Sequence, residues 1–224
     1  MDPFFLDNID EKSDLIPLLS LEDEEKINST KIPKELSILP LKNTVLFPGV
    51  VIPVTVGREK SIKLIKENYV GKKIIGTVSQ KDITIEDPNP SHLNSIGTVA
   101  KIMRLFKMPD GSSTIIIQGL KKFKLKSITQ TDPYFKATVE PFKEIFPKNN
   151  NDTFKALISS LKDTSLKVIK ESPKIPSEVA FAVNNIESDS FLVNFISSNM
   201  NIKVVDKQQI LEEPSLEKRA SITL

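Results

Sequence analysis

The stretch Leu39-Pro-Leu-Lys-Asn-Thr-Val-Leu-Phe-Pro-Gly-Val-Val-Ile-Pro-Val54 decides the fold of this chain. Two aliphatic, β-branched runs flank a turn, and Pro40, Pro48 and Pro53 stand close to their ends. Because proline has no backbone N–H to donate to a sheet, each proline marks a strand edge or terminus. The stretch therefore predicts two short strands, over residues 37–41 and 50–56, joined by an unusually apolar turn.

The residues that follow, up to about residue 142, predict further strands with one inserted helix. Ile62, Ile65 and Tyr69 are spaced by three and four, which indicates a helix over residues 59–69. A polar loop is expected over residues 80–96. Strands are expected over residues 73–79, 97–107, 114–118, 122–126 and 134–139. These elements favour a β-meander that closes into a small barrel.

Two local patterns refine this β region. Asp110-Gly111 lies between two β-branched runs and indicates a hairpin, because such a turn needs a positive φ angle. The run Lys122-Phe-Lys-Leu-Lys126 alternates, so its apolar side chains are expected to face the core and its lysines to face solvent.

The remainder of the chain, residues 143–224, reads as helical. Phe154, Leu157 and Leu161 share one face of a long predicted helix that Pro173 ends. Shorter helices are expected over residues 179–186, after a capping Asp189, over residues 205–211 and from Pro214 onward. The last pattern reaches Leu224 without a stop signal, which indicates a truncated C-terminal helix. The predicted fold class is α+β: a β-barrel lobe (residues 35–142) followed by an α-helical bundle lobe.

Residues 1–34 are expected to form an acidic, largely flexible arm. The first 30 residues carry nine acidic side chains and two lysines, a net charge of −7 against +2 for the whole chain. Such a tail is either solvated or docked on the basic body or a partner. The chain has no cysteine and no apolar run near the ~18 residues that span a bilayer. A cytoplasmic protein without a membrane partner is expected.

No catalytic, cofactor-binding or metal-binding residue is expected. The single histidine, His92, lies in a polar loop, where a solvated side chain is favoured over a general base. Gly71-Lys-Lys73 lacks both the upstream glycine and the hydroxyl residue of a phosphate-binding loop. The carboxylates of Asp82, Glu86 and Asp87 are expected to be solvated.

The apolar turn holds the leading candidates for binding, Leu46 and Phe47. Because turns are usually polar, Phe47 either folds back to plug the barrel or forms an exposed lip that binds polypeptide or a neighbouring subunit. Met103 and Phe106 are further candidates for such contacts. The lysine-lined strand could instead contact RNA, but with no Trp and two Tyr, stacking residues are scarce.

Four blocks together resemble the amino-terminal, substrate-recognition domain of the Lon family of bacterial ATP-dependent proteases. They are residues 39–54 with 56–62, 96–102, 107–111 with 117–120, and 174–179 with 206–211. Each block is modest alone, but their order and spacing are specific. The resemblance covers about residues 37–224.

The resemblance implies a PUA-like β-barrel lobe followed by a helical lobe. It implies a homohexameric parent whose AAA+ ATPase and Ser/Lys-dyad protease lie beyond Leu224, so that ATP and Mg are cofactors of the parent only. This chain would then be a non-catalytic module that recognises unfolded or damaged polypeptides and contacts its own subunits. The alternatives are a purely hexamer-assembly module or an RNA-binding PUA-like protein, although nucleic acid is the less expected partner.

Overall fold

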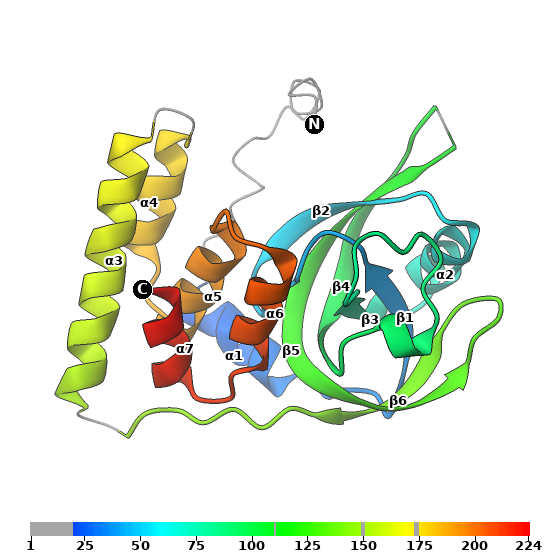
Figure 1. Cartoon of the computed structure of the whole chain (residues 1–224), viewed down its shortest axis with the longest axis horizontal. Helices are drawn as coiled ribbons and strands as arrows, with labels where there is room; N and C mark the ends of the chain where they lie inside the picture. Colours follow the sequence, from blue (N-terminus) through cyan, green and yellow to red (C-terminus); the bar gives the residue numbers. More distant parts are fainter. Residues whose placement is uncertain (1–19, 110, 149–150, 173–174) are drawn as a thin grey trace.

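The computed structural model describes residues 20–109, 111–148, 151–172 and 175–224. Figure 1 shows a β-rich lobe beside a helical lobe, joined by the segment that follows β6. Within the described residues, one six-stranded sheet and seven α-helices confirm the predicted α+β class. The elements in chain order are α1 (Leu21–Ser29), β1 (Glu35–Leu41), β2 (Val51–Val56), α2 (Glu59–Val70), β3 (Ile74–Ser79), a 3-10 turn (Pro90–His92), β4 (Ile96–Lys107), β5 (Ser113–Gln130), β6 (Lys136–Pro141), α3 (Asp152–Glu171), α4 (Ser177–Asn185), α5 (Asp189–Asn199), α6 (Val204–Glu212) and α7 (Leu216–Thr223).

The sheet has the strand order β2-β5-β4-β3-β1-β6. β6 also pairs with β5, so the pairings from β5 through β4, β3, β1 and β6 return to β5. The strands predicted around the apolar turn are confirmed as β1 and β2, but the expected simple meander is wrong. β1 pairs in parallel with β3, and β2 pairs with β5. The inserted helix α2 provides the crossover that a parallel pair requires.

The predicted hairpin is confirmed between β4 and β5. Gly111 has a φ of +83°, and the Met108 N–H donates to the Ser112 carbonyl at 3.0 Å. The two strands expected over residues 114–118 and 122–126 are one long strand, β5. The expectation that all its lysines face solvent is wrong for Lys122, which is buried beneath the helical lobe, whereas Lys124 and Lys126 are exposed.

Side chains cap the first turns of helices in the helical lobe. The Asn151 side chain accepts a hydrogen bond from the Phe154 N–H at 3.0 Å at the start of α3. The cap of α5 is Ser188 rather than the predicted Asp189, and its hydroxyl accepts from the Phe191 N–H at 3.1 Å. Capping oxygens satisfy N–H groups that have no partner inside the helix.

In the part of the chain that the structure describes, two apolar clusters form the core. The first joins the lobes, because Phe47 and Phe123 of the β-rich lobe pack in one cluster with Phe154, Phe191 and Leu216 of the helical lobe. The second lies between the sheet and α2, and its members include Leu46, Leu64, Ile65 and Ile117. The two lobes therefore share one continuous apolar cluster.

The expected arm is described only from residue 20, since residues 1–19 lie outside the described residues. Residues 21–29 form helix α1, which the sequence did not predict. The Ser20 side chain caps it by accepting from the Asp23 N–H at 3.2 Å. Ile27 is buried in the first apolar cluster, so α1 packs on the body of the domain.

Candidate functional site

The apolar turn is buried: Phe47 packs in the cluster that joins the lobes, and Leu46 packs in the cluster between the sheet and α2. Leu46 is 2% exposed and Phe47 is 0% exposed. The Leu46 carbonyl accepts a hydrogen bond from the Thr98 hydroxyl at 2.6 Å, and the Pro48 carbonyl accepts one from the Asn194 side chain at 3.1 Å. The alternative of an exposed lip is therefore corrected, because both candidate side chains contact the core instead of solvent.

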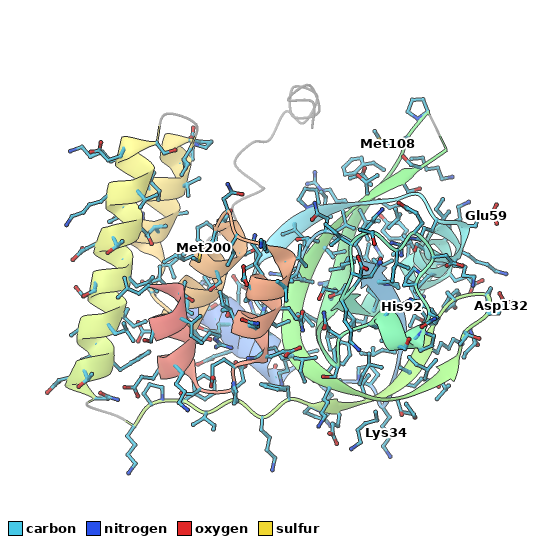
Figure 2. All side chains as sticks on the ribbon, in the orientation of Figure 1. Lys34, Glu59, His92, Met108, Asp132 and Met200 are labelled. Carbon is cyan, nitrogen blue, oxygen red and sulfur yellow. The ribbon has the colours of Figure 1, made fainter. Side chains whose placement is uncertain are left out.

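Met103 and Phe106 are accessible, at 43% and 40% exposure. Both lie on β4, in the half of the β4–β5 hairpin near its tip, where Figure 2 labels Met108. A register shift between Ile102 and Arg104 marks a β-bulge at Met103. A bulge redirects a side chain and bends the strand.

The exposed residues of the hairpin continue onto β2. In the sheet register, Phe106 is opposite Thr114, which is opposite Thr55. Arg104 is opposite Ile116, which is opposite Pro53. Cross-strand partners share a face. Ile116 itself is buried. We call the accessible members of this set the hairpin surface: Pro53, Thr55, Met103, Arg104, Phe106 and Thr114.

This part of β4 is also a strand edge. The pairing of β3 with β4 ends at Ile74 opposite Lys101, and the last hydrogen bond across it runs from the Ile102 N–H to the Lys73 carbonyl at 2.8 Å. From Met103 to Lys107, the only strand in the described ranges that pairs with β4 is β5. An edge of this kind can pair with an extended peptide.

The charge around the hairpin surface is positive. Lys101, Arg104 and Lys107 are exposed on β4. The sequences of β2, of β4 and of β5 up to Gln118 contain no acidic residue. The surface therefore combines apolar side chains with a cationic margin.

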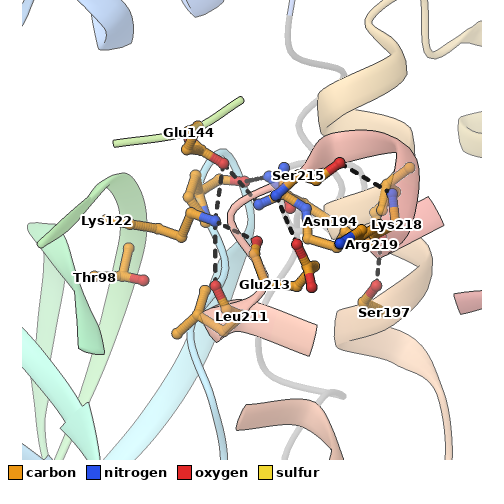
Figure 3. A network of polar contacts seen from close by, with 12 residues as sticks. Thr98, Lys122, Glu144, Asn194, Ser197, Leu211, Glu213, Ser215, Lys218 and Arg219 are labelled. Carbon is orange, nitrogen blue, oxygen red and sulfur yellow. Dashed lines mark hydrogen bonds and ion pairs between the residues drawn. The ribbon is translucent and has the colours of Figure 1, made fainter. Parts of the chain in front are cut away.

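A second polar feature, the Lys122 cluster, joins the lobes (Figure 3). Glu144, in the segment after β6, accepts from Lys122 of β5 at 2.9 Å and from Arg219 of α7 at 2.6 Å. Burial, followed by repulsion from Arg219, lowers the pKa of Lys122 to about 8. Burial raises the pKa of the Glu144 carboxyl, but Lys122 and Arg219 outweigh it and hold that pKa below its ordinary value.

The sequence did not single out this cluster. Lys122 sits in an alternating strand, and Glu144 and Arg219 lie in segments whose charges look like those of any solvated surface. The three residues come from a strand, a connection and the last helix, so only the folded structure shows that they lie together. The cluster holds the lobes together.

The histidine and the loop carboxylates considered from the sequence occupy capping or exposed positions. His92 caps the 3-10 turn, where its Nδ1 accepts from the Asn89 N–H at 3.2 Å. Asp82, Glu86 and Asp87 are exposed. Among residues with described positions, no three His, Cys, Asp or Glu side chains could hold a metal ion together. None of the described helices combines the length and apolar character needed to cross a membrane.

Comparison with protein families matches residues 35–224 to the ATP-dependent protease La (LON) substrate-binding domain. The chain is 50% identical over 224 residues to the Lon protease of Flavobacterium johnsoniae, covering 100% of this chain and 27% of that protein. It is 44% identical over 211 residues to the Lon protease of Cytophaga hutchinsonii, covering 94% of this chain and 26% of that protein. The chain thus spans about a quarter of the length of these relatives.

Solved structures share the fold. The N-terminal domain of a Mycobacterium avium complex Lon protease aligns with a TM-score of 0.69 at 18% identity, covering 85% of this chain and 96% of that chain. A Lon N-terminal domain protein from Xanthomonas campestris aligns with a TM-score of 0.58 at 14% identity, covering 84% and 96%. The family match over residues 35–224 and the 50% identical relative show that the chain belongs to the family of Lon protease substrate-binding domains.

Proposed function

We propose that this chain binds unfolded or damaged polypeptides and delivers them to an ATP-dependent Lon protease that degrades misfolded and regulatory proteins. The family supports a role in substrate binding. The hairpin surface supports a binding site at particular residues. There, Met103 and Phe106 are exposed beside a strand edge that has one partner strand. Leu46 and Phe47 play no direct part in it, because they are buried.

An extended segment of substrate adds to the edge of β4 through main-chain hydrogen bonds. Its apolar side chains cover Met103 and Phe106, while its sequence matters little because the edge contacts are made by the backbone. Several weak contacts of this kind suit a receptor that must accept varied segments.

The closed circuit of strand pairings supports the finer fold assignment, a PUA-like barrel. Within the proposal, this chain has no catalytic role. ATP and Mg act in the ATPase of the parent, the parent is a homohexamer, and it works in the cytoplasm.

Binding is tested with fluorescence anisotropy, using a labelled, permanently unfolded model protein and the whole 224-residue chain. The variant Met103→Ser/Phe106→Ser should raise Kd about 5- to 30-fold, since losing two half-covered apolar contacts costs about 1–2 kcal/mol. Val70→Ser is the matched control, because Val70 is also an exposed apolar residue but lies at the end of α2. Thermal melts check that all variants fold.

Two results would contradict the proposal. The first is no detectable binding by the wild-type chain at high micromolar concentration. The second is an unchanged Kd in the double variant, which would remove the hairpin surface as the site. Self-association on size exclusion without substrate affinity would instead favour an assembly module, and steeply salt-dependent affinity for RNA would favour an RNA-binding one.

A further inference from the structure

A small pocket lies at the start of α2. Figure 1 shows α2 on the side of the sheet away from the helical lobe. Its floor is apolar, and its polar residues come from the first turn of α2 and the loop before the 3-10 turn. The lining residues are Ile38, Pro40, Arg58, Lys60, Ser61, Leu64, Asp87, Pro88, Tyr134 and Phe135.

The first turn of α2 presents unused hydrogen-bond donors to this pocket. Arg58 stands at the N-cap and provides no side-chain cap. The first intrahelical bond runs from the Ile62 N–H to the Arg58 carbonyl, so the N–H groups of residues 59–61 have no acceptor inside the helix. The positive end of the helix dipole adds to their attraction for an anion.

Ser61 supplies an independent sign of a ligand. It is 6% exposed, it lines the pocket, and its hydroxyl makes no hydrogen bond to any residue in the described ranges. The hydroxyl oxygen is not sealed from solvent, so it opens into the pocket, where it can donate to a bound group. The other pocket hydroxyl is occupied, because Tyr134 donates to Glu67 at 2.6 Å. The Ser61 hydroxyl is therefore available to donate a hydrogen bond to a ligand in the pocket.

The charges at the pocket favour an anion with a single charge. Arg58 is held by a neutral amide, with its Nη2 donating to the Gln80 side chain at 2.5 Å, and Lys60 is exposed at the rim. The Asp87 carboxylate also lines the pocket and opposes an anion. The nearby Glu86 is paired with Lys42. Both Glu86 and Asp87 act on Arg58, so with Lys42 and Lys60 three cations stand against two carboxylates. This small positive excess suits a monoanion better than a phosphate dianion.

We propose that the α2 pocket binds a carboxylate group, with one oxygen on the Ser61 hydroxyl and first-turn N–H groups and the charge facing Arg58 and Lys60. The apolar floor formed by Pro40, Leu64 and Phe135 accepts the carbon atoms attached to that group. Assigning the carboxylate to a polypeptide, as its C-terminus or as an acidic side chain, rests on the proposed function. A free small carboxylate would use the same contacts.

The test is a two-dimensional NMR titration of the ¹⁵N-labelled whole chain at constant ionic strength. The probes are sodium acetate, sodium phosphate, and a short alanine-rich peptide in three forms: with a free C-terminus, with an amidated C-terminus, and amidated with one internal glutamate. Acetate and the free-carboxyl peptide should give saturable shifts of the Lys60 and Ser61 amide signals. Phosphate should bind more weakly, and the amidated peptide without glutamate should leave these signals unmoved.

Ser61→Ala should weaken acetate binding about tenfold, the effect of one charge-assisted hydrogen bond. Lys60→Met gives a second measure with little risk to the fold, because Lys60 is exposed, and it should weaken binding several-fold. Lys66→Gln is the control, since Lys66 is an exposed lysine of α2 outside the pocket lining. It should leave the affinity unchanged.

The absence of saturable shifts at Lys60 and Ser61 with acetate would overturn the proposal, as would equal affinity in wild type, Ser61→Ala and Lys60→Met. Either result leaves unfolded-protein binding at the hairpin surface untouched. Binding of acetate without binding of any peptide carboxylate would retain the site and overturn its assignment to polypeptide. Tighter binding of phosphate than of acetate would contradict the charge argument.

Discussion

Lys122 Nζ lies 2.9 Å from Glu144 Oε1, although Lys122 belongs to β5 and Glu144 to the connection that leaves the β-rich lobe. The same oxygen accepts from Arg219 of α7. Lys122 also donates to the Leu211 carbonyl of α6 at 3.1 Å. One carboxylate therefore compensates two buried cations and ties the sheet to the last two helices.

Glu144→Gln should strongly destabilise the chain. The substitution keeps the shape of the side chain but removes the carboxylate that pairs with both Lys122 and Arg219, and leaves only the more distant Glu213 charge acting on Lys122. Arg219 already has two guanidinium nitrogens without a hydrogen-bond partner among the described residues. Removing one partner of a buried ion pair typically costs about 3–5 kcal/mol. The free energy of unfolding, measured by urea denaturation, should fall by that amount.

Glu140→Gln is the matched control for this measurement. Glu140 pairs with Lys126 at 3.1 Å, but both side chains are about half exposed. Exposed pairs contribute about 0–1 kcal/mol. If the two substitutions had the same effect, the Lys122 cluster would not be the connection that we describe.

Stability should rise with pH above about 8 because of Lys122. Its folded pKa of about 8 lies below its ordinary value of 10.5, so between these values the unfolded state binds more protons than the folded state. The unfolding free energy then increases with pH, by about 2 kcal/mol between pH 8 and pH 10 for a shift of this size. Lys122→Met should abolish this increase. Parallel pH profiles for wild type and variant would show that Lys122 does not titrate in this range.

The Lys122 cluster also marks where reasoning from sequence stops. The prediction from the alternating pattern at residues 122–126 is correct for Phe123, Lys124 and Lys126, because one face of β5 points to the core and the other to solvent. It is wrong for Lys122, since helices distant in sequence cover that end of the strand. Local periodicity predicts on which face of a strand a residue lies, but not which elements distant in sequence pack on that face.

The same limit explains the binding candidates. The sequence showed that the turn at Leu46 and Phe47 is too apolar for an ordinary surface turn. However, a turn buried in the core and an exposed binding turn would have the same sequence. Only the position of α5, whose Phe191 packs in the same cluster as Phe47, decides between them. Met103 and Phe106 could be assigned to β4, but their exposure depends on where the pairing of β3 ends.

Phe47→Ala and Phe106→Ala should separate core from surface. Phe47 is fully buried between the lobes, so its truncation should lower the unfolding free energy by about 3–5 kcal/mol. Phe106 is partly exposed at the edge of the hairpin, and its truncation should cost less than about 1 kcal/mol. Urea denaturation of the two variants provides the comparison. Similar losses would mean that the turn does not occupy the interior.

Gly119→Ala should destabilise the chain because β5 passes directly over the buried turn. The Gly119 N–H donates to the Val50 carbonyl and its own carbonyl accepts from the Gly49 N–H, both at 2.9 Å. A Cβ atom at Gly119 would lie 2.2 Å from the Phe47 carbonyl oxygen, which is backbone and cannot rotate away. Relieving such a clash requires a backbone shift, which typically costs about 1–3 kcal/mol.

Gly57→Ala is the control for that substitution, because nothing lies within 4 Å of a Cβ atom there. Alanine in open space restricts the unfolded chain and should leave stability equal or raise it by about 0.4–1 kcal/mol. The midpoints of thermal and urea unfolding should therefore fall for Gly119→Ala and stay equal or rise for Gly57→Ala. A neutral Gly119→Ala would show that β5 does not approach the turn as closely as the Phe47 carbonyl requires.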